Sequence, residues 1–536
     1  MIYRSPYPDV SIPNVALAPF LLQHAGRLAE KPAIIEGETG RTFTYAQLAE
    51  ATRRVAAGLA RHGIHKGDVL ALYCPNGPEY IITLLALWTL GAVPTTINPL
   101  FTARELAYQL KDAGATSLLT APDLLDKATE AARDTGIRTI FLLGAGETAG
   151  TIPYAVLLAE DAAPPAVAIE PRRDLAALLY SSGTTGLPKG VMLTHANIVA
   201  NITQLHALTH VGEDETLMVA LPFFHIAAWV IFLHMGLTRG ATIVTMARFD
   251  LARFLQLSQD HHVTRTLLVP PLVLALAKQP QVDDYRLSYR VIETGAAPLA
   301  ESVARTCEAR LGCAIQQLYG LTETSPITHG NTEAPGKPDV ISVGHCVPNT
   351  ECKVIDPATG AELGPNQQGE LLVRGPQIML GYLNNPEATA RAIEPDVWFH
   401  TGDIGYADEA SAFFIVDRVK ELIKYKGYQV APAELEALLL AHPAVADAAV
   451  IPSPDEEAGE VPKAFVVLKA APTPEDASPD ALMAYVAALV APHKKIRRLE
   501  LTDQIPKTAS GKILRRILVE RERAAVAAPQ RSTVNP

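Results

Sequence analysis

The sequence predicts an α/β protein that is divided into more than one domain. Strand-like and helix-like segments alternate along most of the chain, which is typical of layered α/β structure with a largely parallel sheet. The chain has 536 residues, which is too long for one compact core. Near residue 351 the alternation gives way to short strands, and a separate α+β pattern begins near residue 419.

These changes of pattern predict the domain boundaries. We expect a large N-terminal domain of layered α/β subdomains over residues 1–418, whose last part, about 345–418, forms a small β-rich subdomain. A small α+β C-terminal domain should follow over residues 419–523. Residues 524–536 have the character of a disordered tail.

The alternation begins close to the N-terminus. A strand-like segment at 41–45 precedes a helical segment at 46–62, in which Leu48, Val55 and Leu59 recur on one face. The alternation continues through segments at residues 69–73, 79–90, 117–120, 139–143, 216–244 and 264–295. The β-rich and C-terminal parts contribute segments at residues 352–355, 369–375, 431–441, 448–451 and 464–468, of which 431–441 reads as a helix.

The composition restricts the possible classes of function. Hydrophobic residues make up 48% and charged residues 19% of the chain, as in a globular protein with a substantial core. The formal net charge of -11 argues against general nucleic-acid binding, which requires a basic face. The five cysteines form no CxxC pair, so we expect a reducing compartment and no structural zinc.

Membrane and export signals are also not expected. The first residues lack the apolar core of a signal peptide. The most apolar stretch, about 80–93, contains Gly91 and is followed by Pro94, so it is better explained as a buried helix than as a membrane span. We therefore expect a cytoplasmic protein without a membrane span, present as a monomer or loose homodimer.

The strongest local motif occupies residues 180–190, Tyr-Ser-Ser-Gly-Thr-Thr-Gly-Leu-Pro-Lys-Gly, after an apolar strand at 175–180. Glycines let backbone N–H groups approach phosphate oxygens, hydroxyl groups add donors, and Lys189 adds a mobile positive charge. Because Pro188 precedes Lys189 and Gly190 follows it, the spacing is not that of a Walker A loop. The motif predicts a loop that handles a triphosphate, and a flexible surface loop is the alternative.

The segment 317–324, Gln-Leu-Tyr-Gly-Leu-Thr-Glu-Thr, is the second motif. Tyr319 could stack on a purine face. Thr322 and Glu323 offer the oxygen ligands that magnesium prefers. Alone, this motif is better explained by a turn followed by a helix cap.

Three further segments carry charged groups that ordinary loops also contain. In 398–403 the Thr-Gly-Asp tip could place Asp403 against ribose hydroxyls, or it could form an Asx turn. The segment 415–429 is a charged strand–turn pattern that a solvated hairpin would also show. In 506–512, Pro-Lys-Thr-Ala-Ser-Gly-Lys, Lys512 could be catalytic or simply exposed.

In this order and spacing, the five motifs together resemble the adenylate-forming superfamily of acyl-CoA synthetases, luciferase-type enzymes and peptide-synthetase adenylation domains. The resemblance extends from Thr-Phe-Thr-Tyr at 42–45 to Lys512. Within the superfamily the chain is most similar to the 4-coumarate–CoA ligase branch, which segments 375–379, 381–390 and 420–434 match almost letter for letter.

The resemblance implies a two-step reaction. Such enzymes join a carboxylate to AMP with release of pyrophosphate, and then pass the acyl group to a thiol, usually that of coenzyme A. ATP, Mg²⁺ and coenzyme A are therefore the implied cofactors, and a small carboxylic acid is the implied substrate. The resemblance also implies a mobile C-terminal domain that turns between the half-reactions about a hinge at Lys420.

The nucleotide-binding positions carry over from the motifs. Thr322 and Glu323 would lie near the magnesium ion. Asp403 would hold the ribose hydroxyls with help from Arg418, and Tyr319 would stack on adenine. The positions that match ATP- or AMP-binding residues are Ser181, Ser182, Gly183, Thr184, Thr185, Gly186, Lys189, Gly295, Ala296, Ala297, Pro298, Gln317, Tyr319, Gly320, Thr322, Asp403 and Arg418.

Three residues match catalytic positions of the superfamily. Lys512 matches the lysine that bridges the carboxylate and the α-phosphate, and His225 matches the histidine that gates the acyl pocket. Lys424 begins the segment 424–429, which would form the pantetheine tunnel after domain rotation. The positions implied for coenzyme A are Arg248, Lys426 and Gly427.

The acyl pocket is where the sequence departs from the branch. Phenolic-acid ligases often have a tyrosine two residues after the histidine, where this chain has Ala227, and a small polar residue further on, where it has Ile231. We therefore expect a bulky, mostly apolar acid of the aryl, fatty, polyketide or terpenoid type rather than a hydroxycinnamate. The expected pocket residues are His225, Ala227, Ala228, Trp229, Ile231 and Ala296.

Three alternatives to the acid–thiol ligase differ in how much support they have. Ligases that pass the acyl adenylate to an amine can retain much of the segment 424–429, so amide formation stays open. Luciferase-like oxidation depends on the substrate, and no feature of the sequence points to it. A degenerate scaffold would have lost key residues, whereas this chain keeps Lys189, Glu323, Asp403, Arg418 and Lys512.

Overall fold

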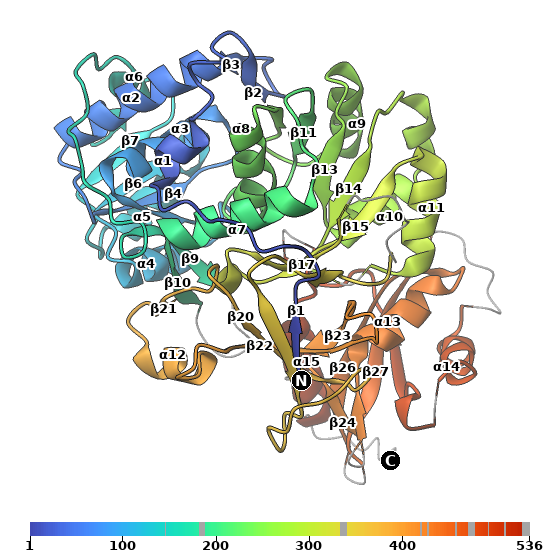
Figure 1. The fold of residues 1–536 in the computed structure, drawn as a ribbon. Coiled ribbons are helices and arrows are strands. Elements are labelled where there is room, and N and C mark those ends of the chain that lie inside the picture. Colours follow the sequence, from blue (N-terminus) through green and yellow to red (C-terminus); the bar gives the residue numbers. More distant parts are fainter. Residues whose placement is uncertain are drawn as a thin grey trace, which may run out of the picture.

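The structure is a computed structural model. It confirms the α/β fold class: two large sheets with flanking helices form the upper part of the view in Figure 1, and smaller β-rich units lie below them. The residues that it describes are 1–144, 146–181, 188–297, 299–332, 340–418, 421–425, 428–455, 458–469, 477–490, 492–508 and 511–527.

The first large sheet has eight strands among the described residues and is parallel except at one edge, where β9, β10 and β21 pair antiparallel. In spatial order its strands are β21 (Gly381–Tyr382), β10 (Lys189–Thr194), β9 (Leu175–Ser181), β5 (Val93–Thr96), β4 (Val69–Tyr73), β6 (Ser117–Thr120), β7 (Thr139–Leu142) and β8 (Ile152–Pro153). The helices of this part of the chain are α1 (Leu17–Leu21), α2 (Tyr45–Arg61), α3 (Pro78–Leu90), α4 (Ala103–Asp112), α5 (Leu125–Ala132), α6 (Tyr154–Leu158) and α7 (His195–Leu208).

The second large sheet has seven strands in the described part of the chain, parallel except for the β2–β3 pair. In spatial order they are β15 (Ala314–Gln317), β14 (Val291–Thr294), β13 (Arg265–Leu268), β11 (Thr216–Val219), β12 (Thr242–Thr245), β2 (Pro32–Glu36) and β3 (Thr42–Thr44). Its helices are the π-helix η2 (Ala228–His234), α8 (Met235–Arg239), α9 (Leu251–Asp260), α10 (Pro270–Lys278) and α11 (Glu301–Leu311).

Local sequence signals explain where several helices begin and end. Helix α7 starts with a capping box, in which the Thr194 hydroxyl accepts from the Asn197 N–H and the Asn197 side chain accepts from the Thr194 N–H. Helix α3 has Pro78 in its first turn and ends at Gly91, whose φ of 65° is left-handed. The predicted strand at 41–45 is one residue shorter at each end in the structure. Its C-terminal end is set by the helix that follows, which begins at Tyr45.

The β-rich unit includes a strand that the sequence analysis missed. Strand β1 (Ile2–Arg4) pairs antiparallel with β19 (Glu351–Ile355), so the N-terminus closes one edge of this sheet. The remaining strands of this sheet are β20 (Gly369–Arg374), β22 (Phe399–Ala407) and β23 (Phe413–Arg418). A three-stranded sheet of β16 (Tyr319–Gly320), β17 (Ile327–Gly330) and β18 (His345–Cys346) accompanies it, with α12 (Pro386–Ala392) nearby in the chain.

The C-terminal part forms its own sheet and core, shown in orange and red in Figure 1. Its strands are β25 (Tyr428–Val430), β24 (Ile423–Tyr425), β27 (Gly459–Leu468), β26 (Val445–Asp455) and β28 (Arg498–Leu501), and its helices are α13 (Pro432–Ala441), α14 (Pro479–Ala487) and α15 (Arg515–Ala527). Helix α15 extends past residue 523 to Ala527, and residues 528–536 lie outside the described part. The boundaries at 418 and 523 stay predictions.

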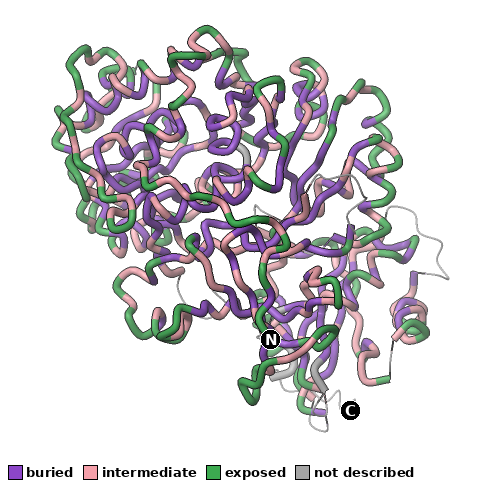
Figure 2. The backbone as a smooth tube through the Cα atoms, in the orientation of Figure 1, coloured by how far each residue is buried: buried purple, intermediate pink, exposed green. Residues whose placement is uncertain are grey.

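The largest core lies between the helices and sheets of the N-terminal part. Figure 2 shows that buried positions follow the strands of the two large sheets, whereas exposed positions collect at loops and on outer helices. At the centre, the indole rings of Trp88 and Trp229 stack with centroids 5.7 Å apart. All five cysteines are buried and unpaired. The longest apolar helices fall short of a membrane-crossing span throughout the described ranges.

Candidate active site

The predicted phosphate loop connects two antiparallel strands. Strand β9 ends at Ser181 and β10 begins at Lys189. Helix α4 contacts both flanks of the loop, because the Tyr108 hydroxyl donates to the Pro188 carbonyl at 3.1 Å and Asp112 accepts from the Tyr180 hydroxyl at 2.7 Å. The expected phosphate-binding residues Ser182, Gly183, Thr184, Thr185 and Gly186 lie outside the described residues.

Lys189 and Glu323 contact different parts of the same tyrosine, Tyr382. The ammonium nitrogen of Lys189 lies 4.8 Å from the centroid of the Tyr382 ring. The Tyr382 hydroxyl donates to Oε1 of Glu323 at 2.9 Å. Burial, and then the Glu323 charge, raise the pKa of Tyr382, so its hydroxyl stays a neutral donor. The sequence analysis quoted the segment that contains Tyr382 and gave it no role.

The pair Thr322 and Glu323 fits a magnesium ion that is held mainly by phosphate oxygens. The two residues occupy the short helix η4 (Thr322–Thr324), and the Glu323 side chain is 6% exposed. They supply one carboxylate and one hydroxyl, and magnesium usually takes one or two protein carboxylates together with substrate phosphates. In keeping with this, no group of three or more His, Cys, Asp or Glu residues in the described ranges could hold a metal by itself.

The residues predicted to contact adenosine come together between the two β-rich sheets. The Tyr319 hydroxyl donates to Oδ2 of Asp403 at 2.7 Å. Burial, and then the charge of Asp403, raise the pKa of Tyr319 far above its ordinary value. Asp403 on β22 lies opposite Arg418 on β23. Gly320 is required here, since a Cβ at this position would overlap the carbonyl oxygen of Pro326.

The segment after β14 is held in a strained conformation. Ala296 has a φ of 69°, a left-handed value that costs an alanine free energy. The Gln317 amide donates to the Val340 carbonyl at 2.6 Å and accepts from the Leu299 N–H at 3.3 Å. Its side chain thus supports this loop from within the protein, whereas its contact with a nucleotide stays a prediction. Gly295 and Ala297 lie in the same loop, and Pro298 lies outside the described residues.

Lys512, near the C-terminus, lies close to His225, which comes from the middle of the chain. Burial, and then the positive charge of Lys512, lower the pKa of His225 to about 4, so the imidazole is neutral at physiological pH. The Lys512 loop is seated against the large domain, because a Cβ on Gly511 would lie 3.2 Å from Cγ of Pro271 at the start of α10. The ring of Phe224 packs on His225, with centroids 4.2 Å apart.

The residues expected to act on coenzyme A are not gathered at this site. Lys424 is exposed on β24, where its backbone N–H donates to Glu460 at 2.8 Å. Figure 1 shows β24 at the end of the C-terminal part that points away from the two large sheets. Arg248 is exposed between β12 and α9. Lys420, Lys426 and Gly427 lie outside the described residues.

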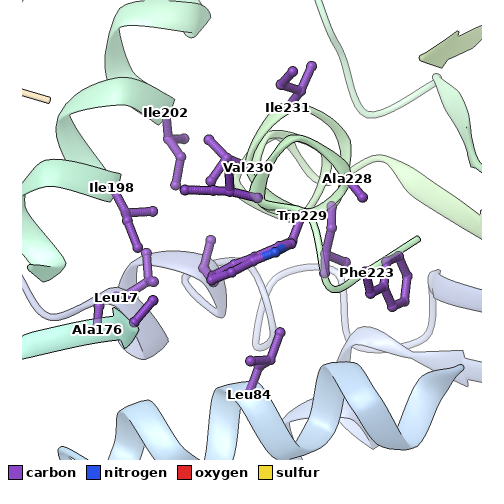
Figure 3. Close-up of a cluster of buried hydrophobic side chains, with 14 of the residues drawn as sticks. Leu17, Leu84, Ala176, Ile198, Ile202, Phe223, Ala228, Trp229, Val230 and Ile231 are labelled. Atoms are coloured by element: carbon purple, nitrogen blue, oxygen red, sulfur yellow. The ribbon is translucent and has the colours of Figure 1, made fainter. Parts of the chain in front are cut away.

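The expected wall of the acyl pocket divides into two sets. Ala227 is half-buried beside His225, whereas Ala228, Trp229 and Ile231 are buried in the hydrophobic core. Figure 3 shows the Trp229 indole among core side chains of α1, α3, α7 and β9. The turn that follows His225 is a π-helix, η2, which the sequence analysis did not anticipate. Trp229 therefore packs behind the predicted wall, against Trp88.

Comparisons with known proteins identify the family of the chain. Two family models match: AMP-binding enzyme over residues 21–383 and AMP-binding enzyme C-terminal domain over residues 434–512. The chain is 43% identical to 4-coumarate–CoA ligase 5 of Oryza sativa subsp. japonica over 528 residues, which cover 96% of each chain. It is also 43% identical to 4-coumarate–CoA ligase 2 of Nicotiana tabacum, over 97% of this chain and 96% of the other.

Solved structures with the same fold include two at 28% sequence identity. ATP-bound MatB from Rhodopseudomonas palustris has a TM-score of 0.85 and covers 94% of this chain and 98% of its own. A benzoate CoA ligase from Burkholderia xenovorans LB400 has a TM-score of 0.84 over 94% of this chain and all of its own. The anthranilate CoA ligase AuaEII, in complex with anthranoyl-AMP, shares the fold at 24% identity with a TM-score of 0.88 over 97% of this chain and 99% of its own.

Proposed function

The chain belongs to the family of AMP-binding enzymes, and we propose that it is an ATP-dependent acid–thiol ligase which forms an acyl adenylate and passes the acyl group to coenzyme A. The observation that carries the proposal is the seating of the Lys512 loop against the large domain, near the half-buried, neutral His225. Full-length similarity to 4-coumarate–CoA ligases supports the same two-step reaction.

In the first step, a carboxylate oxygen of the acid attacks the α-phosphorus of ATP, and the bond to the β-phosphate breaks to release pyrophosphate. Both reactants are anions, so the site must neutralise charge and align the attack. Lys189 would hold the leaving phosphates and Lys512 would bridge the carboxylate and the α-phosphate. Magnesium, held near Thr322 and Glu323, would neutralise phosphate charge. Because His225 is neutral, it would line the pocket without forming an ion pair with the carboxylate of the acid. That carboxylate would then be left to Lys512.

In the second step, the thiol sulfur of coenzyme A attacks the acyl carbonyl, and the carbon–oxygen bond to AMP breaks. The nucleotide would stay in place through Tyr319 and Asp403, which already hydrogen-bond to each other. Lys424 is exposed and remote in this arrangement, so we propose that the C-terminal part turns about Lys420 to bring the segment 424–429 to the site. Arg248, Lys426 and Gly427 would then contact coenzyme A.

The proposed acid is bulky and mostly apolar. Two curated relatives at 43% identity are named for 4-coumarate, and one solved neighbour is named for benzoate, which favours an aryl or arylalkyl acid. Ala227 supplies no hydroxyl group at a half-buried position beside His225, so a phenolic substrate would find one hydrogen-bond partner fewer. We also propose a cytoplasmic location and a monomer or loose homodimer.

A substrate panel tests the proposed function. Purified protein is incubated with MgATP and each of a set of aryl, arylalkyl and medium-chain fatty acids, once with coenzyme A and once with amino acids. AMP release and product mass are recorded. We expect acid-dependent AMP release and acyl-CoA products with the apolar acids. Amide products in the second arm would identify an amide-forming ligase, and no AMP release with any acid would overturn the proposal.

A further inference from the structure

Tyr382 contacts both of the charged residues to which the proposed function assigns ATP and its metal ion. Its ring face lies 4.8 Å from the ammonium nitrogen of Lys189. Its hydroxyl donates to Oε1 of Glu323 at 2.9 Å. The two contacts use different parts of one side chain, so they can be removed separately by substitution.

Strand register places the Tyr382 ring where it is. Strand β21 pairs antiparallel with β10, with Tyr382 opposite Val191. Side chains two residues apart in a strand share a face, so Lys189 lies on the Val191 face and diagonally across from Tyr382. The backbone N–H of Tyr382 also donates to the Thr389 hydroxyl at 2.9 Å, which fixes the short strand to α12.

Tyr382 contacts two groups of opposite charge. Lys189 and Glu323 are both described by the structure, and they make no ion pair with one another. Glu323 is buried, so a direct ion pair with Lys189 would be strong and would turn both groups away from a substrate. A neutral ring attracts the lysine through its π face, while its hydroxyl satisfies one carboxylate oxygen.

We propose that Tyr382 is a positioning residue for adenylation: its hydroxyl orients the Glu323 carboxylate toward the metal ion of MgATP, and its ring directs Lys189 toward the phosphates. The inference rests on the proposed function, because it takes Lys189 and Glu323 as the groups that bind MgATP. It assigns separate effects to the ring and to the hydroxyl.

Two variants and one control separate these effects. Tyr382→Phe removes the hydroxyl and keeps the ring, whereas Tyr382→Leu removes both. Tyr289→Phe is the matched control, because its buried hydroxyl donates to Ser258 at 2.7 Å next to the second large sheet. ATP binding is measured by titration calorimetry, once with excess Mg²⁺ and once with EDTA, and the Mg²⁺ dependence of pyrophosphate exchange is recorded.

We expect Tyr382→Phe to weaken MgATP binding roughly tenfold, the usual effect of losing a hydrogen bond to a charged group, and to leave metal-free ATP binding unchanged. The half-saturating Mg²⁺ concentration should rise by a similar factor, with little change in kcat at saturating Mg²⁺. Tyr382→Leu should weaken binding of both forms of ATP. Tyr289→Phe should change neither.

The inference is overturned if the Mg²⁺ dependence of exchange in Tyr382→Phe equals that in Tyr289→Phe. It is also overturned if Tyr382→Phe binds the metal more tightly. If Tyr382→Leu is misfolded by its melting curve, Tyr382→Phe decides alone, since it keeps the ring packing. Failure of the proposed function is distinguishable, because the unmodified protein would then show neither MgATP binding nor exchange, and the inference would fall with it. If the unmodified protein is active and Tyr382→Phe changes neither MgATP binding nor the Mg²⁺ dependence, the inference is overturned and the proposed function stands.

Discussion

His234 should make the stability of the protein depend on pH. It ends the π-helix η2, with its ring centroid 5.2 Å from that of Trp88 and 5.4 Å from that of Trp229. The side chain is 1% exposed, and within the described ranges neither ring nitrogen has a hydrogen-bond partner. Burial lowers the pKa of His234 to about 3, because a charged imidazole is poorly solvated there.

The magnitude follows from proton linkage. Histidine in an unfolded chain has a pKa of about 6.5. Between pH 6.5 and about 3, the unfolded chain binds a proton at this position that the folded chain does not bind. The free energy of unfolding therefore falls as the pH falls through this window. From pH 7 to pH 5 the loss is about 2 kcal/mol for this one group, since each pH unit below the unfolded pKa costs about 1.4 kcal/mol.

The assay compares melting temperatures at pH 7 and pH 5 for the unmodified protein and His234→Phe. The variant should lose less stability on acidification, by roughly 2 °C in Tm for a domain of this size. The buried His195 and the half-buried His206 are present in both proteins, so the difference isolates His234. His65→Phe, at an exposed position, is the control. An equal drop in Tm for His234→Phe and the unmodified protein would refute the reasoning.

Two further substitutions test the pocket and the adenosine site. Ala227→Tyr should lower kcat/KM for bulky apolar acids relative to hydroxylated aryl acids by about tenfold or more, since it fills a half-buried position beside His225. An unchanged preference in the acid panel would mean that Ala227 does not line the pocket. Gly320→Ala should destabilise the fold by about 1–3 kcal/mol and weaken ATP binding, because its Cβ would overlap the Pro326 carbonyl. Melting curves and titration calorimetry that match the unmodified protein would contradict this prediction.

The amino-acid sequence was sufficient to predict those features that have a distinctive local residue composition. Alternating apolar segments predicted the α/β class, and the glycine- and hydroxyl-rich segment 180–190 predicted a loop after the strand at 175–180; the structure adds the strand that follows, β10. The Thr-Gly-Asp segment and the Tyr-Gly segment were predicted to share a site, and Tyr319 does hydrogen-bond to Asp403. Their residue types marked these segments as candidates, and the order and spacing that resemble a known superfamily implied their roles.

Features that depend on register or helix phase could not be predicted in the same way. Tyr382 reaches Lys189 only because β21 pairs with β10 in one register. Trp229 follows His225 closely and therefore looks like pocket wall, but the π-helix directs its side chain into the core. Strand β1 has three residues and a partner more than 300 residues away in the chain, so no local pattern reveals it.

We propose that Lys512, seated near His225, drives adenylation, while Lys424 serves only the later transfer to a thiol. The most direct test is acid-dependent exchange of labelled pyrophosphate into ATP, measured for Lys512→Ala and Lys424→Ala beside the unmodified protein. Lys512→Ala should lower the exchange rate by about 10²–10³-fold, as when a transition-state charge partner is removed. Lys424→Ala should keep the exchange rate of the unmodified protein, while its thioester formation slows. Wild-type exchange in Lys512→Ala, or an equal loss in both variants, would contradict the account.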